Sequence, residues 1–582
     1  MNNNEILSLL SQLKEQGIRI RANQGELKVS STCALDEQII KTIKTNKNDL
    51  LNYLIKSESS SIIALPEDQR HETFELNENQ QAYWLGRSQS VEGGGVAIHL
   101  YFEIEATALD IDKLQSAWEA MVMRHDMLRA VVTPSGYQKV LKEVTVPPFN
   151  IVDGEGRFEV MIAKVRERLS HANYDLTQWP QHQFELVKSS DKATLCLSLD
   201  CWCIDGWSYQ ILFQEWLQLY RDELPLPYLE LTFRDYCHYA SGALSEKQLD
   251  YIDKQAEQLP PAPVVPETGR FSEAPSFRRH EYWLSHEQTQ KLKNWCANYG
   301  VSLASTLLTL YAEVLHLWSS NDRFTLNVPR FNRNTDDIRI QKIIGEFATF
   351  SLVEFDFSIE MERQLRISNV QKSILESVAM GVSGVDILRK RNTLTESSQS
   401  MPFVFTNAPE WVMENGEKQS FIDTIQKFGR LEYAISQTPQ VKIDCQYHES
   451  SEGLYVFWDT RDDQFHTGQV EQMFSVFIDN IQRLLSISTP SLYPQVMPVA
   501  PISDLTLLEG DVWTDFTHTV DRYPNQLAVA CEQGEITWSN LAERVSALAY
   551  QISSYRLAPN QAILIMAEKG WQHIAAYLAI HQ

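Results

Sequence analysis

The middle of the chain, from about Phe74 to Leu485, alternates amphipathic helical patterns with β-rich segments. A proline-rich stretch at 259–266 interrupts this alternation, as is typical of a connection between compact units. Helices that alternate with strands favour an α/β architecture. We therefore expect two α/β lobes, which comprise residues 73–265 and 266–500.

Shorter units are expected on either side of the two lobes. Residues 1–56 carry an apolar helical stripe and two short strands whose polarity alternates around Asn23-Gln24-Gly25, a pattern that indicates a hairpin. Residues 57–72 contain serines and a proline and are interpreted as a linker. A third unit occupies 505–582 and stops within a helical pattern, so we expect it to be the first part of a larger domain.

The charge of the chain excludes some classes of partner. Lys and Arg number 51 and Asp and Glu 76, for a net charge of −25. A nucleic-acid binder needs a clustered positive surface, and an acidic membrane would also be repelled, so neither is an expected partner. Residues 1–60 hold eight basic and seven acidic residues, which leaves −26 for the rest.

Localisation and metal binding are judged from apolar runs and cysteines. The longest apolar stretches are only a few residues, far below the roughly 20 of a spanning helix, and a signal peptide is not evident, so we expect a cytoplasmic protein. Eight cysteines are sparse. Cys201 and Cys203 are close in sequence, but no neighbours complete a tetrahedral set, so no metal site is expected.

Two carboxylates stand at a predicted strand-to-helix turn, in the pattern Asp200-x4-Asp205-x2-Ser208. They could form an acid/base pair or a metal site. They could also be structural, with Asp205 capping the helix and pairing with an arginine. The residues alone leave these alternatives open.

This pattern resembles the signature of heterocyclization domains, the variant condensation domains of non-ribosomal peptide synthetases. Ordinary condensation domains carry His-His-x3-Asp-Gly there, and the two histidine positions hold Asp200 and Cys201 in this chain. Further motifs resemble those of the family in the expected order; they are Phe74–Arg87, Arg124–Arg129, Met401–Thr406 and Ser436–Gln446. Gly345-Glu346-Phe347-Ala348 departs from the usual Gly-Asp-Phe-Thr, and the lost hydroxyl at Ala348 puts full activity in question.

The resemblance implies two chloramphenicol-acetyltransferase-like lobes in a V with a central tunnel. A donor acyl or peptidyl thioester and an acceptor Cys, Ser or Thr would arrive on the 4′-phosphopantetheine arms of carrier proteins. Amide formation, ring closure and loss of water would give a thiazoline or oxazoline. The chain itself is expected to bind no cofactor.

The same resemblance points to Thr438, Gln440 and Asp459 as catalytic residues. The alternation of 441–447 and 454–459 predicts a hairpin with Asp459 opposite about Ile443. Asp459 would then lie on an apolar face, which raises a carboxyl pKa and suits a general acid.

Two further expectations follow from this predicted hairpin. Asp444 is expected on the other face, in a structural or solvated role. Thr438 would lie roughly 16 Å along the strand from the partner of Asp459, so the two could meet only if 436–439 folds back.

The two flanking units carry resemblances as well. Residues 1–56 resemble N-terminal docking domains of the tubulysin-synthetase type, which implies that Arg19, Arg21 and Lys28 bind an acidic tail of an upstream subunit; an ordinary solvated surface is the alternative. The last unit resembles the start of an adenylation domain without its phosphate loop. The alternatives to heterocyclization are condensation alone and a non-catalytic scaffold that docks carriers.

Overall fold

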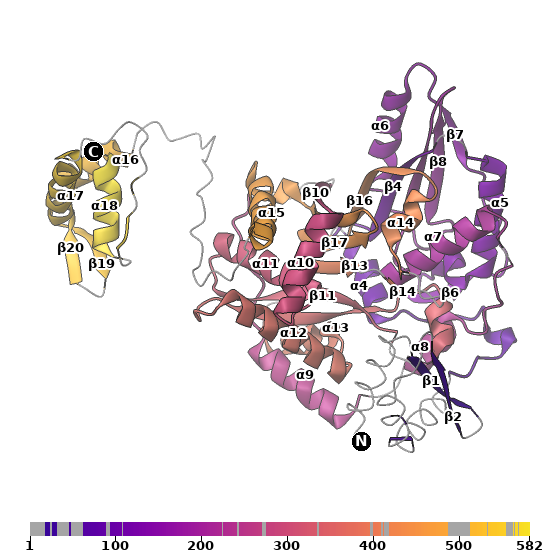
Figure 1. Cartoon of the computed structure of the whole chain (residues 1–582). Coiled ribbons are helices and arrows are strands. Elements are labelled where there is room, and N and C mark those ends of the chain that lie inside the picture. Colours follow the sequence, from indigo (N-terminus) through magenta and orange to yellow (C-terminus); the bar gives the residue numbers. More distant parts are fainter. Residues whose placement is uncertain are drawn as a thin grey trace. The chain divides into compact units, whose positions relative to one another are not determined.

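The computed structural model describes residues 18–23, 26–31, 43, 46–47, 62–486 and 512–581, the last two ranges with short internal gaps (Figure 1). The chain divides into two compact units, Met1–Tyr493 and Pro494–Gln582, which are described separately. The helices predicted within 1–56 fall almost entirely outside the described residues. The docking and adenylation boundaries drawn from the sequence remain predictions.

The predicted N-terminal hairpin is confirmed. β1 (Ile18–Asn23) pairs antiparallel with β2 (Glu26–Ser31), and Asn23 stands opposite Glu26 across the turn. The register places Arg21 opposite Lys28. Two of the three residues proposed for docking are therefore cross-strand neighbours.

The first lobe is built on a five-stranded sheet. In spatial order its strands are β16 (Arg430–Gln437), β4 (His99–Ala106), β9 (Ala193–Asp200), β8 (His182–Lys188) and β7 (Asn150–Asp153). Neighbours are antiparallel except for the parallel pair of β7 and β8. A small sheet joins β3 (Phe74–Glu75), β6 (Tyr137–Val140) and β5 (Ala130–Val132). The helices are α4 (Glu78–Gly86), α5 (Ile111–Arg124), α6 (Phe158–Leu169), α7 (Gly206–Tyr220) and α8 (Phe233–Ala240).

The second lobe is built on a six-stranded sheet. Its order is β10 (Arg278–Ser285), β18 (Gly453–Thr460), β17 (Ile443–Ser450), β13 (Phe403–Ala408), β11 (Arg323–Phe331) and β12 (Ala348–Asp356). β13 runs parallel to both of its neighbours. The helices are α9 (Glu246–Gln258), α10 (His286–Asn298), α11 (Leu303–Trp318), α12 (Arg363–Met380), α13 (Gly384–Leu394) and α15 (Gln469–Ser486).

Shorter elements connect these sheets. They are α14 (Phe421–Gln426), β14 (Trp411–Val412), β15 (Lys418–Gln419) and the 3₁₀ turns η1 (Glu67–Gln69), η2 (Asp126–Arg129), η3 (Ile338–Lys342) and η4 (Asp462–Gln464). Many helices begin at the polar side chains that capping requires, and Asn77, Ser245 and Ser285 form complete capping boxes.

The expected two-lobed α/β fold is confirmed, but the boundary at 265/266 does not separate the lobes fully. β16 comes from the second half of the sequence and pairs with β4 of the first lobe. Residues of α14 and β16 also join the hydrophobic core of the first lobe. The chain therefore crosses from the second lobe to the first, where β16 pairs with the edge of β4, and then returns to the second sheet as β17.

The linker expected at 57–72 also differs in the structure. From Ile62 onward the chain is held by the body: the Ile62 backbone N–H donates to Asp337 and that of Leu65 to Asp235. The Arg70 guanidinium pairs with Asp126 at 2.8 Å. These residues pack against the first lobe because buried carboxylates accept their backbone and side-chain donors.

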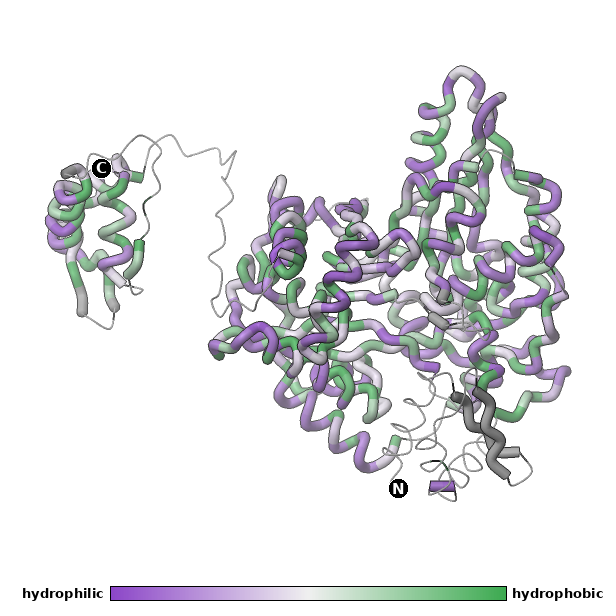
Figure 2. Tube along the Cα trace, in the orientation of Figure 1, coloured by the Kyte–Doolittle hydropathy of each residue, from purple (hydrophilic) through white to green (hydrophobic). Residues whose placement is uncertain are grey.

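The faces of the second sheet differ in polarity. Residues of α10, α11, α12 and α15 pack with alternate residues of β17 and β18 in one buried apolar cluster. Figure 2 shows the corresponding interleaving of hydrophobic and hydrophilic residues along the helices. Because strand side chains alternate, the remaining residues of β17 and β18 point to the opposite face of this sheet.

The C-terminal unit has its own small core. It contains α16 (Val512–Arg522), β19 (Leu527–Cys531), β20 (Gly534–Thr537), α17 (Trp538–Ser554) and α18 (Trp571–His581). Buried Phe516, Leu541, Val545 and Leu578 lie at its centre.

Within the described ranges, no single helix is long and apolar enough to cross a membrane. α10 and α11 pass that test of length and composition only when taken together, and they are bent by 96° at their junction.

Candidate active site

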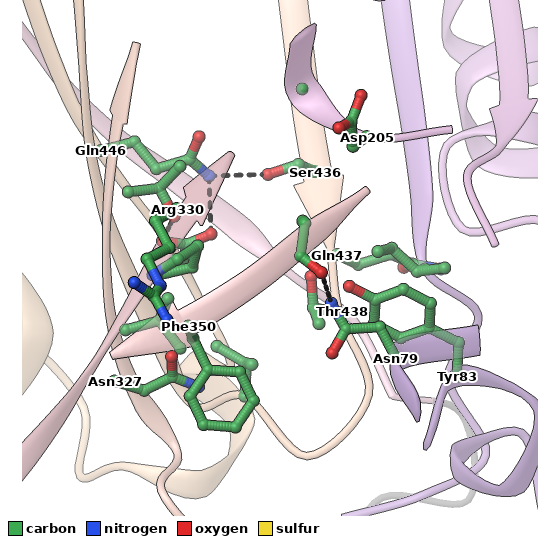
Figure 3. Close-up of a pocket in the computed structure, with 18 of the residues that line it drawn as sticks. Asn79, Tyr83, Asp205, Asn327, Arg330, Phe350, Ser436, Gln437, Thr438 and Gln446 are labelled. Carbon is green, nitrogen blue, oxygen red and sulfur yellow. Dashed lines mark hydrogen bonds between the residues drawn. The ribbon is translucent and has the colours of Figure 1, made fainter. Parts of the chain in front are cut away.

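A cavity of about 940 Å³ is lined by both lobes. Figure 3 shows Asn79, Tyr83 and Asp205 of the first lobe on one side of it and residues of the second sheet on the other. Thr438 and Gln440 line it, as do Asp205 and Asp444. The cavity therefore gathers several of the residues selected from the sequence.

Thr438 and Gln440 belong to the tight connection between β16 and β17. Gln440 adopts a left-handed conformation with φ of 63°, and its backbone N–H donates to Gly93 at 3.1 Å. Pro439 packs against α4, where a Cβ on Gly86 would lie 2.4 Å from the Cβ of Pro439. Gly86 in the 74–87 motif is thus required because Pro439 in the 436–446 motif leaves no room for a side chain there.

The structure places Asp459 differently from the sequence expectation. Asp459 is 1% exposed, and its carboxylate pairs with Arg279 at 2.7 and 2.5 Å. Ser436 donates to it from both its backbone N–H and its hydroxyl. The expected apolar setting is therefore wrong, because β10 pairs with β18 and brings Arg279 opposite Asp459.

The register of the predicted hairpin is wrong by one residue. Asp459 stands opposite Asp444, whereas Ile443 stands opposite Thr460. The connection has only two residues, between Ser450 and Gly453, instead of the longer turn expected. A slip of one residue exchanges the faces of a strand, so Asp444 lies on the same face as Asp459.

Thr438 does not fold back onto Asp459 as the expected pairing would require. The neighbouring Ser436 makes the contact instead. This happens because the end of β16, where the chain leaves the first lobe for the second sheet, contacts β18, so Ser436 lies beside Asp459 without any reversal of the chain.

Asp444 is half-buried and lines the cavity. Burial is the largest cause that raises its pKa to about 7; a hydrogen bond from the Thr406 hydroxyl at 2.9 Å opposes this shift, and the charge of Asp459 adds to it. A carboxyl group with this pKa exchanges protons near neutral pH. Asp444 therefore has the property that was expected of Asp459.

A chain of hydrogen bonds joins the two aspartates. The Gln446 side-chain amide donates to Asp444 and to the Ser436 hydroxyl, each at 2.9 Å (Figure 3). Ser436 in turn donates to Asp459 at 2.5 Å. Asp459, held by Arg279, thus fixes Ser436 and Gln446, which orient the carboxyl of Asp444.

Asp200 is buried at the end of β9. One guanidinium nitrogen of Arg87 donates to both of its oxygens at 2.6 Å. Burial raises the pKa of Asp200 above its usual range, while Arg87 opposes the shift. This contact joins Arg87 of the 74–87 motif to Asp200. Asp200 is not among the described residues that line the cavity, and its ion pair indicates a structural role.

Asp205 is the N-cap of α7, and it pairs with Arg333 at 3.1 Å. Its Oδ1 accepts from the backbone N–H and the hydroxyl of Ser208. Ser208 also donates to the Gly345 carbonyl at 2.9 Å. The structural alternative for Asp205 and Ser208 is therefore what the geometry shows, although Asp205 also faces the cavity.

Glu346 is a second cavity carboxyl with a raised pKa. Burial and the nearby charge of Asp205 bring its pKa to about 8. It accepts from the Asn79 side chain at 3.3 Å and from the backbone N–H of Ala348 at 3.2 Å. Glu346 stands where the family usually has aspartate, so this position still places a carboxyl group in the cavity lining.

Sequence reasoning quoted Thr406 and Gln446 within motifs but gave them no role. The signal that could have identified them is the alternation along β17, where Ile443 and Cys445 belong to the apolar cluster. Asp444 and Gln446 must then point away from it. The pairing with β13, which places Thr406 beside Gln446, is not visible in the sequence.

One group of possible metal ligands lies within the described residues, and it is outside the cavity lining. It comprises His280, Asp462 and Glu471. Arg278 already pairs with Glu471 at 2.6 Å and with Asp462 at 3.5 Å. This cationic neighbour makes the group an ion-pair cluster.

Residues 70–492 match the condensation domain family, which is most of the chain. The chain belongs to this family. Membership confirms the resemblance drawn from the motifs, and the condensation domain now accounts for both lobes and for the cavity between them.

Similar proteins include relatives of greater length. Pyochelin synthetase PchF of Pseudomonas aeruginosa is 30% identical over 97% of this chain and 31% of its own length. Phenyloxazoline synthase MbtB of Mycolicibacterium paratuberculosis is 29% identical over 88% of this chain and 45% of its own. The chain thus spans about a third to a half of these relatives.

One solved structure matches this chain over nearly the whole length of the solved protein. It is the cyclization-docking bidomain of the EpoB non-ribosomal peptide synthetase from Sorangium cellulosum, with a TM-score of 0.69 and 28% identity. The match covers 83% of this chain and 99% of that one. The two-lobed architecture is therefore shared with a cyclization domain.

Proposed function

We propose that the condensation domain of this chain catalyses heterocyclization in non-ribosomal peptide synthesis. It would join a donor acyl or peptidyl thioester to a carrier-bound Cys, Ser or Thr and then close a thiazoline or oxazoline ring. The observation that carries this proposal is Asp444, a carboxyl with a pKa of about 7 that lines the cavity between the lobes. The similarity to a cyclization domain and to a phenyloxazoline synthase supports it.

The first step is amide formation. The acceptor amine attacks the donor thioester carbonyl, a C–N bond forms, the C–S bond breaks, and the amine proton passes to the released carrier thiol. This step needs mainly positioning, because the thioester is already activated. The chain binds no cofactor in this scheme, since both substrates arrive on the 4′-phosphopantetheine of carrier proteins.

Ring closure follows on the same carrier. The acceptor thiol or hydroxyl attacks the new amide carbonyl, and its proton goes to the carbonyl oxygen to give a hydroxyl. Protonated Asp444 donates to that hydroxyl as the C–O bond breaks, water leaves, and the C=N bond forms as the nitrogen loses its proton back to Asp444. The Thr406 hydroxyl and the Gln446 amide hold this carboxyl in place.

Asp459, Thr438 and Gln440 take other roles in this proposal. Asp459 positions Ser436, and through it Gln446, while Thr438 and Gln440 shape the cavity wall at the crossover between lobes. The hairpin of 1–56 is proposed to recruit an acidic C-terminal tail of an upstream subunit.

The test uses the full chain with donor and acceptor carriers, and with Cys, Ser or Thr loaded in turn. Intact-mass spectrometry of the acceptor carrier is expected to show the amide and then a product lighter by one water. An amide without water loss for all three acceptors would reduce the function to condensation. Absence of any product would favour a scaffold that only docks carriers.

A further inference from the structure

One part of the cavity follows β16 and β4, the neighbouring strands at one edge of the first-lobe sheet. Leu431, Ala434 and Ser436 on β16 line it, as do Leu100 and Phe102 on β4. The register sets Ser436 opposite Leu100 and Ala434 opposite Phe102, so these side chains share one face of the sheet. We call this part of the cavity the β16 section and define it by these five residues.

The β16 section begins beside the proposed acid. The Ser436 hydroxyl donates to Asp459 and accepts from the Gln446 amide, which also donates to Asp444 (Figure 3). Ala434 is two residues from Ser436 on the same face, or about 7 Å along the strand. A group that starts at a carbonyl beside Asp444 and runs along β16 therefore passes Ala434.

The other end of the β16 section is closed by the hydrophobic core of the first lobe. Leu431 packs against this core and stands opposite Ile104, after a bulge in β16. Ile104, Ile425 and Phe428 are buried in the core and are not among the described residues that line the cavity. A carrier arm needs an open path to the protein surface, whereas a section that ends in a packed core holds a group that terminates there.

The wall that faces the β16 section is apolar as well. Three residues of α14 and β18 line the cavity and form one buried cluster; they are Ile422, Tyr455 and Phe457. Phe421 and Leu431 pack against this cluster. The section therefore lies between apolar walls from both lobes, and burying apolar substrate atoms there is favourable.

The ionisable groups of this wall favour an uncharged ligand. Arg279 lines the cavity, but it is already paired with Asp459. Burial and the Arg279 charge lower the pKa of His448 to about 3, and burial raises the pKa of Tyr455, so both side chains are neutral near pH 7. Because a charge buried without a partner is costly, the section suits an uncharged, apolar group.

The proposed reaction leaves one group that can fill the β16 section. The acceptor side chain is taken up in the new ring, and both carrier arms must lead out to the surface. The tail of the donor acyl group remains. A chain of about six carbons spans the roughly 7 Å from the reacting carbonyl to Ala434.

We propose that the β16 section binds the tail of an apolar donor acyl group, and that the small side chain of Ala434 lets this tail pass. The inference rests on the proposed function for the place of the reacting carbonyl. Ala434 is thus a specificity-determining residue, which touches the donor but takes no part in proton transfer.

The test is a competition between donors in the full chain. Donor carriers loaded with hexanoyl and acetyl groups are mixed equally with a cysteinyl acceptor carrier, and the two amides are quantified by intact mass. Hexanoyl amide is expected to exceed acetyl amide by about tenfold, because each buried methylene group contributes several-fold. An adipoyl donor has the same carbon number but ends in a carboxylate, so it is expected to compete about tenfold less well than hexanoyl.

Variants assign the preference to Ala434. Ala434→Leu fills the passage and is expected to lower the ratio of hexanoyl to acetyl amide to about one. Ala434→Val adds less volume and should give an intermediate ratio; it decides the question if Ala434→Leu does not fold. The matched control is Ala240→Leu, because Ala240 is exposed on α8 and is not among the described residues that line the cavity. It should keep the wild-type ratio.

Three results would overturn the inference. They are equal use of hexanoyl and acetyl by the wild type, equal use of hexanoyl and adipoyl, and an unchanged ratio in both Ala434 variants. Slowing of both donors by the same factor in these variants would indicate that a carrier arm occupies the section instead.

Because the readout is the amide, it separates this inference from the proposed function. A chain-length preference without water loss would refute ring closure alone. Ring closure without the preference would refute only this inference, whereas the absence of any amide would refute both.

Discussion

At the scale of single residues, the two aspartates that face each other across β17 and β18 have different environments. Asp459 is ion-paired with Arg279, while Asp444 faces the cavity. The sequence indicated an acid on this hairpin but selected Asp459, because a shift of one residue in register decides which carboxyl lies where. The ion pair depends on β10, whose pairing with β18 is not a local property of the hairpin.

Two isosteric substitutions separate these roles. Asp444→Asn is expected to form the amide but to slow ring closure by a factor of about 100 or more, since it removes the proposed proton donor. Asp459→Asn is expected to lower the free energy of unfolding by about 3–5 kcal/mol, because it leaves the Arg279 charge buried without a partner. Intact-mass kinetics and urea denaturation measure the two effects. A fully stable Asp459→Asn that alone lost ring closure would return the acid role to Asp459.

The pH dependence of water loss reports on Asp444. Burial raises its pKa to about 7, so the protonated form that acts as the acid predominates below that pH. The rate at which a preformed carrier-bound amide loses water should therefore fall as pH rises through about 7. Asp444→Asn should lack this inflection; a wild-type rate that instead increases through this range would contradict an acid role.

At the scale of elements, the turn between β16 and β17 depends on α4. Gly86→Ala would place a Cβ 2.4 Å from the Cβ of Pro439, so the turn or the helix must move. Overpacking of this kind costs about 1–3 kcal/mol, which should appear as a lower melting temperature together with slower product formation. Adding Pro439→Gly, which removes the facing Cβ, should recover part of the stability. Wild-type behaviour of Gly86→Ala would show that this contact is dispensable.

The N-terminal hairpin supports a prediction about partners. Arg21 pairs with Lys28 across the strands, and Arg19 lies two residues before Arg21. Charge reversal by Arg19→Glu with Arg21→Glu should weaken the binding of an acidic upstream tail about tenfold at low salt, with a smaller effect at high salt.

The matched control for this charge reversal is Lys247→Glu with Lys254→Glu, which makes the same charge change on exposed positions of α9. Binding is measured by fluorescence anisotropy of a labelled acidic peptide. Equal affinity for both double variants would remove the docking proposal.

Much of the element order could be predicted from the sequence, because helical and strand periodicities are local. The hairpin of β1 and β2 and the capping of α7 by Asp205 follow from neighbouring residues. The placement of β16 in the first lobe does not. It requires the edge of β4, which lies more than 300 residues earlier in the chain.

The same limit explains what was missed at the candidate site. Thr406 on β13, Gln446 on β17 and Ser436 on β16 come from three strands that meet only in the folded second lobe and its crossover. The motif residues can be selected from the sequence, but their proposed division into acid, orienting and structural groups depends on these long-range pairings.

At the scale of the whole molecule, the motifs recognised one by one prove to be partners. Asp200 forms an ion pair with Arg87 of the 74–87 motif. Glu346 accepts a hydrogen bond from the side chain of Asn79, which belongs to that same motif. These contacts join widely separated segments around one cavity between two lobes. The net charge of −25 leaves carrier proteins and a peptide tail as the proposed partners, rather than nucleic acid.

The fate of the donor carbonyl oxygen tests the central claim most directly. A donor thioester labelled with oxygen-18 at its carbonyl is supplied with a seryl acceptor carrier, and the product is followed by intact-mass spectrometry. Ring closure by attack of the acceptor hydroxyl on the amide carbonyl predicts that the label is retained in the amide and then lost with the departing water. A dehydrated product that keeps the label would show that the serine oxygen left instead, which would contradict ring closure by attack of the acceptor hydroxyl on the amide carbonyl.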